Sequence, residues 1–280
     1  MPSMTTAVII TTYNEPAWLD KVLYGYSLQT DQNFRLIIAD DGSGPDTKAI
    51  VQKYELTFGT QRLVHVWQKD EGFQKSRIMN KAVATTDDEY LIFSDGDCIP
   101  RADFVATHRQ RAQPGHFLSG GYFKLSAAVS NALQHEHIKN GQAFEKEWLY
   151  RQGLPKTYKT LKLTAKGQFA DFMNWITPAG APWNGHNSSG WRSDIVKVNG
   201  YDERMQYGGQ DRELGERMFN AGVRSRQIRY SAICLHLEHK RPYRTDKSIN
   251  KNRGIRATTK REKRTWTEYG ISLHNKDTTD

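Results

Sequence analysis

Short apolar runs alternate with helical patterns through the first hundred residues. Four runs predict strands, and the segments between them place apolar residues at helical spacing on one side. Alternation of strands and helices at these lengths is typical of βαβ units, so we expect an α/β fold with a mostly parallel sheet flanked by helices. The strand runs are "TAVIITTY", "FRLIIADDGS", "RLVHVWQ" and "EYLIFSD", and the helical segments are the one containing Trp18 to Tyr26, "DTKAIVQKYE" and "KSRIMNKAVATT".

The pattern loosens after Pro100. A polar, aromatic-rich stretch, "NALQHEHIKNGQAFEKEWLYRQ", predicts helix, whereas "GQFADFMNWITPAGAPWNGHNSSGW" is rich in Gly, Asn and aromatic residues and predicts substrate-facing loops. Next, "YGGQDRELGERMFNAG" predicts a turn and a helix that ends at Gly222, and "SRQIRYSAICLHLEH" predicts a late strand. We therefore expect one principal domain, whose second half is less regular than its first.

Composition narrows the class of protein. The 280 residues are 37% apolar, which is enough for a conventional core, and no stretch has the roughly 20 consecutive apolar residues of a membrane span. The N-terminal residues also lack the pattern of a signal peptide, so we expect a cytoplasmic protein. Cys98 and Cys234 have no CxxC or His-rich context, and we expect both to be reduced thiols.

The positive charge is concentrated near the C-terminus. Residues 240–264 carry eleven Lys and Arg against only Asp246 and Glu262, which accounts for the whole net charge of +9. A solvated tail is one interpretation of this segment. The alternative is attraction to an anionic membrane surface, a phosphorylated acceptor or nucleic acid. Composition alone does not separate these two.

Acidic residues stand at the ends of predicted strands. The carboxyl ends of parallel strands meet at one edge of a sheet, where ligands bind. Asp95 and Asp97, separated only by Gly96, can both reach a divalent cation that bridges to a pyrophosphate. An acidic turn is the alternative. The sequence contains neither GxGxxG after its first strand nor a P-loop, so any nucleotide must be held differently.

Five ordered segments resemble family 2 glycosyltransferases of the GT-A fold. They are "VIITTYNE", "IIADDGS", "DEGFQKSRIMNKAV", "LIFSDGDCIP" with the DXD motif, and "VNGYDERMQYGGQDRELGERM", which is similar to galactosyltransferase-like and chondroitin-synthase-like members. The resemblance covers about residues 5–240. It implies one GT-A domain over 1–240, with a nucleotide-sugar half at 1–100 and an acceptor-binding, catalytic half at 101–240, followed by a basic tail at 241–280.

The resemblance also implies roles in binding a UDP-sugar. Asp41 would accept a hydrogen bond from uracil or ribose, although an Asx-turn is the alternative for this residue. Asp95 would bind ribose or sugar hydroxyls beside Gly96, and Asp97 would bind Mn2+ or Mg2+. The further donor-site residues are Thr11, Tyr13 and Glu15 around base and ribose, and Arg77 with Lys75 near the diphosphate or base.

Asp211 is the candidate general base. An inverting transfer needs a carboxylate that removes the proton of the attacking hydroxyl, and similar enzymes carry Glu-Asp where this chain has Gln210 and Asp211. The neutral Gln210 puts the acceptor contacts of the usual Glu in doubt, and a helix N-cap is the alternative role for Asp211. His236 matches a histidine that relatives use as a metal ligand. We expect His239 to face the other side of the strand.

The residues expected at the acceptor combine flat apolar faces with hydrogen-bonding groups, a mixture that suits sugars. For Trp183, as for Trp191, the alternative is that the ring pins the loop to the core. Besides Gln210, the expected residues are Trp183, Asn184, His186 and Asn187.

Together these features predict an inverting, metal-dependent hexosyltransferase. It would transfer a hexose or N-acetylhexosamine from a UDP-sugar to a glycan or glycolipid acceptor, such as lipopolysaccharide core or capsule, and the tail could hold it at a membrane. A sugar-1-phosphate nucleotidyltransferase is one rival, but it needs a Gly-rich, Arg-bearing loop after the first strand. The other rival is a non-enzymatic protein that binds anionic surfaces or nucleic acid, which leaves the ordered carboxylates unexplained.

Overall fold

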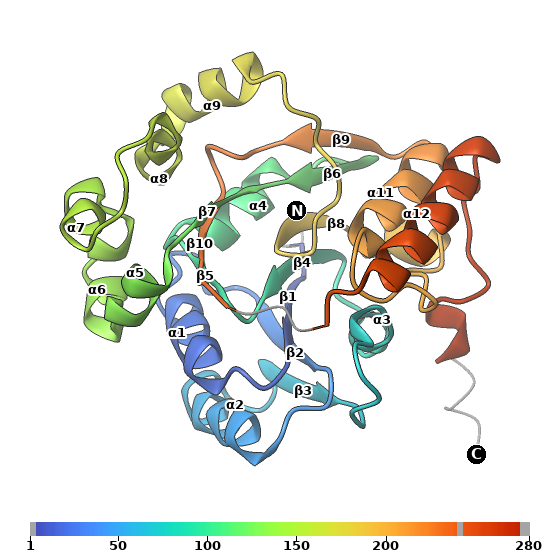
Figure 1. Ribbon diagram of the computed structural model, residues 1–280, viewed down its shortest axis with the longest axis horizontal. Coiled ribbons are helices and arrows are strands. Elements are labelled where there is room, and N and C mark those ends of the chain that lie inside the picture. Colours follow the sequence, from blue (N-terminus) through green and yellow to red (C-terminus); the bar gives the residue numbers. More distant parts are fainter. Residues whose placement is uncertain (1–3, 240–242, 275–280) are drawn as a thin grey trace.

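The computed structural model describes residues 4–239 and 243–274, which form two sheets surrounded by helices (Figure 1). The larger sheet has seven strands in the order β3-β2-β1-β4-β8-β6-β9. Strands β1 to β4 are mutually parallel, whereas β8 is antiparallel to both of its neighbours, β4 and β6. This confirms the predicted α/β class with a mixed, mostly parallel sheet.

The first hundred residues fold as their pattern predicts. Each of the first three strands is followed by a helix that returns the chain, so the carboxyl ends of β1, β2 and β4 lie at one edge. Pro16 and Pro45 occupy the first turns of their helices, where the missing N–H costs nothing. The elements are β1 (Thr6–Thr12), α1 (Pro16–Ser27), β2 (Arg35–Asp40), α2 (Pro45–Phe58), β3 (Leu63–Trp67), α3 (Lys75–Ala84) and β4 (Tyr90–Asp95).

The sheet is completed by segments that the sequence pattern did not assign to it. Strand β8 (Asn187–Trp191) lies beside β4, although we expected loops there, because its "NSSGW" run is polar and gives no apolar signal. The predicted late strand divides into β9 (Arg224–Gln227) and β10 (Ile233–His236), which belong to different sheets. Strand β6 (His116–Ser119) lies between β8 and β9.

The smaller sheet brings the last strand of the chain beside the acidic turn. Its order is β5 (Cys98–Pro100), β10, β7 (Gly121–Lys124). The antiparallel register of β5 and β10 places His236 opposite Cys98, and the amide of Leu237 donates to the carbonyl of Asp97 at 2.9 Å. This pairing joins residues almost 140 positions apart and builds one corner of the candidate site.

Two apolar cores cover the two faces of the large sheet. Alternate residues of β1 point to opposite faces, so Val8 and Ile10 contribute to one core while Ala7 and Ile9 contribute to the other. The first core also includes residues of α1, α2 and β10, and the second includes residues of α3 and α11 (Gln210–Asn220). Burial of both faces explains the continuous apolar run of β1.

The remaining helices are mostly short. The predicted helix over residues 131–152 is broken into several pieces, and the following stretch contains α9 rather than loops throughout. No helix within residues 4–239 and 243–274 is long and apolar enough to cross a membrane. The helices and 3-10 turns between β5 and α11 are α4 (Phe104–Arg111), α5 (Ala127–Ala132), α6 (His135–Lys139), η1 (Gln142–Phe144), α7 (Lys146–Arg151), η2 (Tyr158–Thr160), α8 (Leu161–Thr164), α9 (Gly167–Ile176) and α10 (Arg192–Lys197).

The segment expected to be a basic tail packs on the domain over its described residues. Helix α12 (Asp246–Arg261) lies against α11, and the buried side chain of Asn252 donates to the carbonyls of Gln206 and Gly208. Beyond α12, the turn η3 (Ile271–Leu273) places Ile271 in the second core. The interpretation as a solvated tail therefore does not hold for 243–274. Residues 240–242 and 275–280 lie outside the described residues.

A buried ion pair fixes α11 in place. Glu213 and Arg217, each with a side-chain exposure of 1%, face each other at 2.8 Å. Arg217 also donates to the carbonyls of Val198 and Gly200, and Thr259 of α12 donates to Glu213 at 2.9 Å. These bonds satisfy both charges, as burial of an ion pair requires. They tie α11 to α12 and to the loop after α10.

Replacing one member of this pair should destabilise the fold. We expect Glu213→Gln to lower the free energy of unfolding by about 3–5 kcal/mol, because it leaves the Arg217 charge buried without a counter-ion. The matched control is Glu262→Gln, which removes an exposed carboxylate from the same region and should leave the free energy of unfolding close to that of the native protein. Urea unfolding followed by circular dichroism measures both values. Equal, small effects would contradict the assigned role of the pair.

Candidate active site

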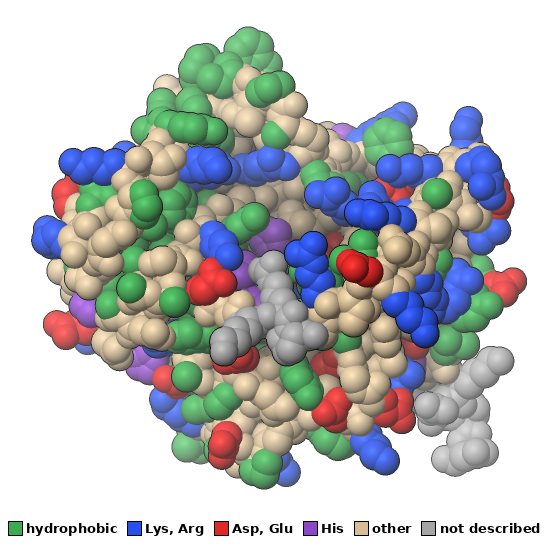
Figure 2. Space-filling model, viewed as in Figure 1, with side chains coloured by type: hydrophobic (Ala, Val, Ile, Leu, Met, Phe, Trp, Pro, Cys, Tyr) green, Lys and Arg blue, Asp and Glu red, His purple; other side chains and the backbone are tan. Residues whose placement is uncertain are grey.

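A cleft of about 560 Å³ opens at the carboxyl ends of β1 and β4. Figure 2 shows histidine side chains in the hollow at the centre of this face. The cleft collects residues from the loops after β1, β2 and β4, from the start of α3 and α11, and from the end of β10. Its lining residues are Thr11 to Glu15, Asp41, Gly72, Phe73, Lys75, Ile78, Asp95 to Asp97, His186, Tyr207, Gln210, Asp211, His236, His239 and Tyr243.

Asp95 is held by two donors. Its Oδ1 accepts hydrogen bonds from the Thr11 hydroxyl and the Lys75 ammonium, both at 2.6 Å. Burial opposes ionisation of Asp95, but the Lys75 charge and these two bonds outweigh burial and hold its pKa well below the usual range. Asp95 is therefore a carboxylate fixed in one orientation. Its other oxygen, Oδ2, accepts neither of these two bonds.

Gly96 lets the acidic turn pass close to β1. Its amide donates to the carbonyl of Thr11 at 2.7 Å, and a Cβ at this position would lie 3.0 Å from that same oxygen. A larger residue would push the turn away from the strand. The residue between the two aspartates is thus small because the backbones of β1 and the turn are in contact.

Asp41 lies at the end of β2 with both carboxylate oxygens engaged. Oδ2 accepts from the amide of Gln74 at 2.8 Å, and Oδ1 accepts from the side chain of Gln68 at 2.6 Å. Burial raises its pKa to about 6, in spite of these two hydrogen bonds. Asp41 caps the turn before α3 and also lines the cleft. Its bonds are not those of an Asx-turn within "DDGS", since Asp40 accepts from the amide of Ser43 instead.

The opposite corner combines Asp97 with two histidines. The Nε2 atoms of His239 and His236 lie 2.8 Å and 3.6 Å from Asp97 Oδ2, and the two rings are stacked. We expected His239 to face away, and this was wrong because β10 ends at His236, so strand alternation does not extend to residue 239. Burial opposes ionisation of Asp97, but the two imidazoles more than offset this and lower its pKa.

The donor atoms in this corner fit a divalent cation. His236 Nδ1 lies 2.8 Å from the carbonyl of Leu237, which can only accept, so Nδ1 carries the proton and the lone pair of the neutral ring is on Nε2, on the side of Asp97. Ligand atoms of Asp97 and His236 lie close enough to share one ion, and a carboxylate with an imidazole suits Mn2+ better than Ca2+. The nearby Cys98 thiol donates to Asp97 at 3.3 Å. Burial raises the pKa of Cys98 well above its ordinary value, so it is a protonated donor rather than a thiolate ligand.

Asp211 stands at the start of α11 and lines the cleft. Gly209 is the N-cap residue of this helix, which excludes the capping role considered for Asp211. Its buried Oδ1 accepts no hydrogen bond from the described part of the chain. Burial raises the pKa of Asp211, while the charge of Lys75 partly counteracts that rise. A buried carboxylate with an unused oxygen and a raised pKa is suited to removing a proton.

Several predicted residues lie in the cleft, but others do not. Arg77 is absent from the cleft lining, because its guanidinium is 2.7 Å from Glu71 and 3.9 Å from Glu203. Its neighbour Lys75 occupies the central position instead. The predicted donor residues that line the cleft are Thr11, Tyr13, Glu15, Asp41, Lys75, Asp95 and Gly96.

Of the predicted acceptor residues, only His186 and Gln210 line the cleft. Trp183 is fully buried and donates to Tyr201 at 2.9 Å, so its ring pins the loop to the core. Asn187 uses its amide on His108 and on the carbonyl of Gly121, and Asn184 holds the same turn by accepting from the amide of Asn187. These three residues shape the loop and are not positioned to contact an acceptor in the cleft.

Sequence reasoning missed an aromatic cluster at the mouth of the cleft. Phe73, Tyr207 and Tyr243 contact one another, with ring centroids 4.9 to 5.7 Å apart. They come from three distant segments, so no local pattern could have grouped them. Their flat faces are suited to stacking on a nucleobase or a sugar.

Comparison with known proteins identifies relatives of this chain. Residues 7–173 match the family model described as glycosyl transferase family 2. The chain is 25% identical over 269 residues to an uncharacterized glycosyltransferase, YfnE, of Bacillus subtilis (strain 168), covering 84% of this chain and 65% of the relative. It is 26% identical to validoxylamine A glucosyltransferase of Streptomyces hygroscopicus subsp. jinggangensis (strain 5008), covering 80% of this chain and 54% of the relative. The chain thus spans between about half and two thirds of these two relatives.

Solved structures with the same fold include nucleotide-sugar enzymes. A mannosyltransferase from Pyrobaculum calidifontis, PcManGT, in complex with GDP-Man and Mn2+ superposes with a TM-score of 0.57 at 17% identity, covering 85% of this chain and 58% of the other. TarS residues 1–349 from S. aureus in complex with UDP gives a TM-score of 0.54 at 14% identity, covering 84% and 61%. These likenesses confirm the GT-A fold.

Proposed function

Because the chain belongs to glycosyl transferase family 2, we propose that it transfers a hexose or N-acetylhexosamine from a UDP-sugar to a hydroxyl of a glycan, with inversion. The observation that supports this proposal is that all the groups needed for the transfer line a single cleft. The acidic turn Asp95 to Asp97, the His236 and His239 imidazoles, and the Asp211 carboxylate all line it. A donor diphosphate and an acceptor hydroxyl need these groups in one place.

In this proposal the donor lies along the carboxyl ends of β1, β2 and β4. Asp41 accepts a hydrogen bond from the base, Asp95 orients ribose or sugar hydroxyls through its Oδ2, and Lys75 adds positive charge near the diphosphate. Asp97, His236 and His239 would hold Mn2+ or Mg2+, which neutralises charge on the departing UDP when bound. Phe73, Tyr207 and Tyr243 offer stacking faces at the mouth.

Asp211 then acts as the general base. Its carboxylate takes the proton of the acceptor hydroxyl while that oxygen forms a bond to the anomeric carbon from the face opposite UDP. The bond from the anomeric carbon to the diphosphate oxygen breaks, and its electron pair leaves with UDP. The Lys75 ammonium interacts electrostatically with both Asp95 and Asp211. Its positive charge therefore favours the ionised form of Asp211.

We propose an acceptor at or near the cytoplasmic face of a membrane, such as a lipopolysaccharide core or capsule precursor. Two described surfaces support membrane proximity. Helix α12 exposes Lys247, Lys251 and Arg253, and α9 exposes aromatic side chains, with Trp175 at 81%. Basic and aromatic residues on surface helices favour an anionic lipid interface.

A first test measures UDP release from a panel of UDP-sugars with Mn2+, with and without chelator. We expect slow, metal-dependent hydrolysis of one donor and faster release when a suitable glycan is added. We expect Asp211→Asn to reduce acceptor-dependent transfer by about 10²–10⁴-fold, because the amide cannot take the proton. The same variant should still bind UDP, which calorimetry checks. Normal transfer by Asp211→Asn would exclude it as the base.

Metal binding can be tested without turnover. We expect Asp97→Asn and His236→Ala to weaken Mn2+ binding, which electron paramagnetic resonance of free Mn2+ measures during titration of the UDP-bound protein. A matched control is His116→Ala, which removes a histidine remote from the cleft lining. Equal Mn2+ affinity in the native protein and both cleft variants would overturn the assignment of this corner.

The raised pKa of Asp41 predicts how binding of the base depends on pH. Above its pKa of about 6 the carboxylate can accept from the base, whereas below it the group is protonated, so uridine affinity should fall as pH decreases through about 6. Uridine is the probe because it has no phosphate that titrates in this range. In Asp41→Asn the affinity should be lower at neutral pH and flat between pH 5 and 7. The same pH profile in both proteins would contradict the role of Asp41.

A further inference from the structure

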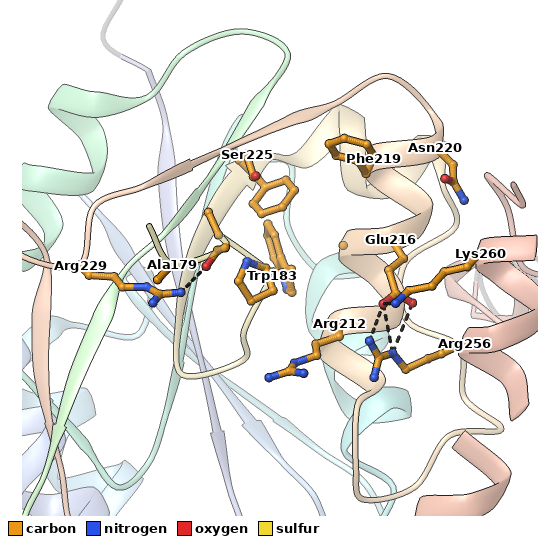
Figure 3. Close-up of a pocket in the computed structure, with 15 residues that line it drawn as sticks. Ala179, Trp183, Arg212, Glu216, Phe219, Asn220, Ser225, Arg229, Arg256 and Lys260 are labelled. Atoms are coloured by element: carbon orange, nitrogen blue, oxygen red, sulfur yellow. Dashed lines mark hydrogen bonds and ion pairs between the residues drawn. The ribbon is translucent and has the colours of Figure 1, made fainter. Parts of the chain in front are cut away.

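A second cavity, of about 610 Å³, lies beside α11 and shares no lining residue with the donor cleft (Figure 3). It is open to the surface and is lined by one face of α11, by α12, by residues 179–183 before β8, and by residues in and near β9. The catalytic proposal assigns it no role. Its walls differ from those of the donor cleft in both charge and apolar content.

The lining of this cavity is strongly basic. It contains Arg212, Arg229, Arg256 and Lys260 against a single acidic residue, Glu216. Two of the cations already neutralise that acid, since Arg256 and Lys260 lie 2.5 Å and 3.3 Å from Glu216 (Figure 3). Arg212 and Arg229 therefore supply positive charge that the cavity itself does not balance. Figure 2 shows Lys and Arg side chains gathered over α11 and α12.

Neither of these two arginines forms an ion pair with a carboxylate in the part of the chain that the structure describes. Within residues 4–239 and 243–274, Arg212 makes no ion pair or hydrogen bond, and Arg229 donates to the carbonyl of Gly180 but to no carboxylate. Figure 3 shows Arg212 extending from α11 away from Glu216, toward the side from which Arg229 extends. Partial burial disfavours the charged form of Arg229 and lowers its pKa. A bound anion would offset this unfavourable desolvation of the guanidinium. A guanidinium presents a planar fork of donors that matches carboxylate and phosphate oxygens.

Apolar surface accompanies the charges. Phe219 is 51% exposed at the cavity, and Phe117 and Pro182 also line it. A free inorganic anion gains nothing from such surface, whereas a sugar places its C–H face on aromatic rings while an attached acidic group reaches the arginines. The lining therefore fits a saccharide that carries an anionic substituent.

Two chain segments link the cavity to the proposed base. Arg212 follows Asp211 on α11, so one helix supplies a residue to each cavity. The segment that forms one wall at 179–183 continues to Gly185, where a Cβ would lie 2.7 Å from Asp211 Oδ1. The same helix and the same loop thus contribute to both the second cavity and the surroundings of Asp211.

We propose that this cavity is an acceptor subsite that recognises a carboxylate or phosphate group on the glycan acceptor, through Arg212 and Arg229. The inference rests on the proposed transfer function and adds the chemical class of the acceptor. It predicts that anionic acceptors are preferred over neutral ones of the same size.

The test compares acceptors that differ only in charge. Glucuronate-terminated, glucose 6-phosphate-terminated and glucose-terminated oligosaccharides are supplied with the active donor, and kcat/KM is measured for each. We expect the native protein to favour at least one anionic acceptor over the neutral one by about tenfold or more. In Arg212→Gln/Arg229→Gln this ratio should fall toward one, chiefly through a higher KM. Comparison of the glucuronate-terminated and phosphate-terminated acceptors shows which anionic group the subsite binds.

Arg226→Gln is the matched control. Arg226 is exposed on β9, next to the lining residue Ser225 and so on the opposite side of the strand, and its replacement also removes one positive charge. It should keep the native preference, and circular dichroism checks the fold of each variant. Equal use of charged and neutral acceptors by the native protein, or an unchanged ratio in the double variant, would overturn the subsite. Absence of donor hydrolysis without any acceptor would instead refute the transferase proposal, so the two failures are distinguishable.

Discussion

The buried ion pair between Glu213 and Arg217 is the interaction on which both halves of the site depend. Arg217 holds the carbonyls after α10 and Glu213 accepts from Thr259, so one pair fixes α11 against two other segments. Asp211 lies two residues before Glu213 on that helix, and Arg212 follows Asp211. Any rotation of α11 would move the proposed base and the basic cavity together. The buried pair therefore fixes the positions of both candidate sites.

Within the cleft, charge is arranged so that neighbouring carboxylates differ in basicity. Asp95 accepts hydrogen bonds from Lys75 and Thr11 and has a depressed pKa. Asp211 is buried, one of its oxygens accepts no hydrogen bond from the described residues, and its pKa is raised. One carboxylate is therefore a fixed hydrogen-bond acceptor, and the other is available to bind a proton. Different environments give two acidic groups different pKa values, and this allows them to perform different chemical roles.

The sequence predicted the strands and helices of the first hundred residues well because its signals are local. Strands ending in Asp40 and Asp95 follow from apolar runs, and parallel topology brings such ends to one edge. Prediction from the sequence failed where a residue's position depends on a contact with a distant part of the chain or on a polar strand. Strand β8 has no apolar pattern, the role of Asn187 depends on His108 and Gly121, and His239 reaches Asp97 only because β10 stops at His236. Likewise, no spacing indicated that residues 243–274 would pack against α11.

The pairing of β10 between β5 and β7 also sets an order of assembly. The acidic turn leaves the ribosome with the first hundred residues, but His236 joins it only when β10 has been made and inserted between two earlier strands. Contacts of such long sequence separation form late, since they must overcome the entropy of closing the loop between them. The nascent chain consequently passes most of its synthesis with this corner incomplete. A half-made molecule therefore lacks the full set of side chains that line the candidate site.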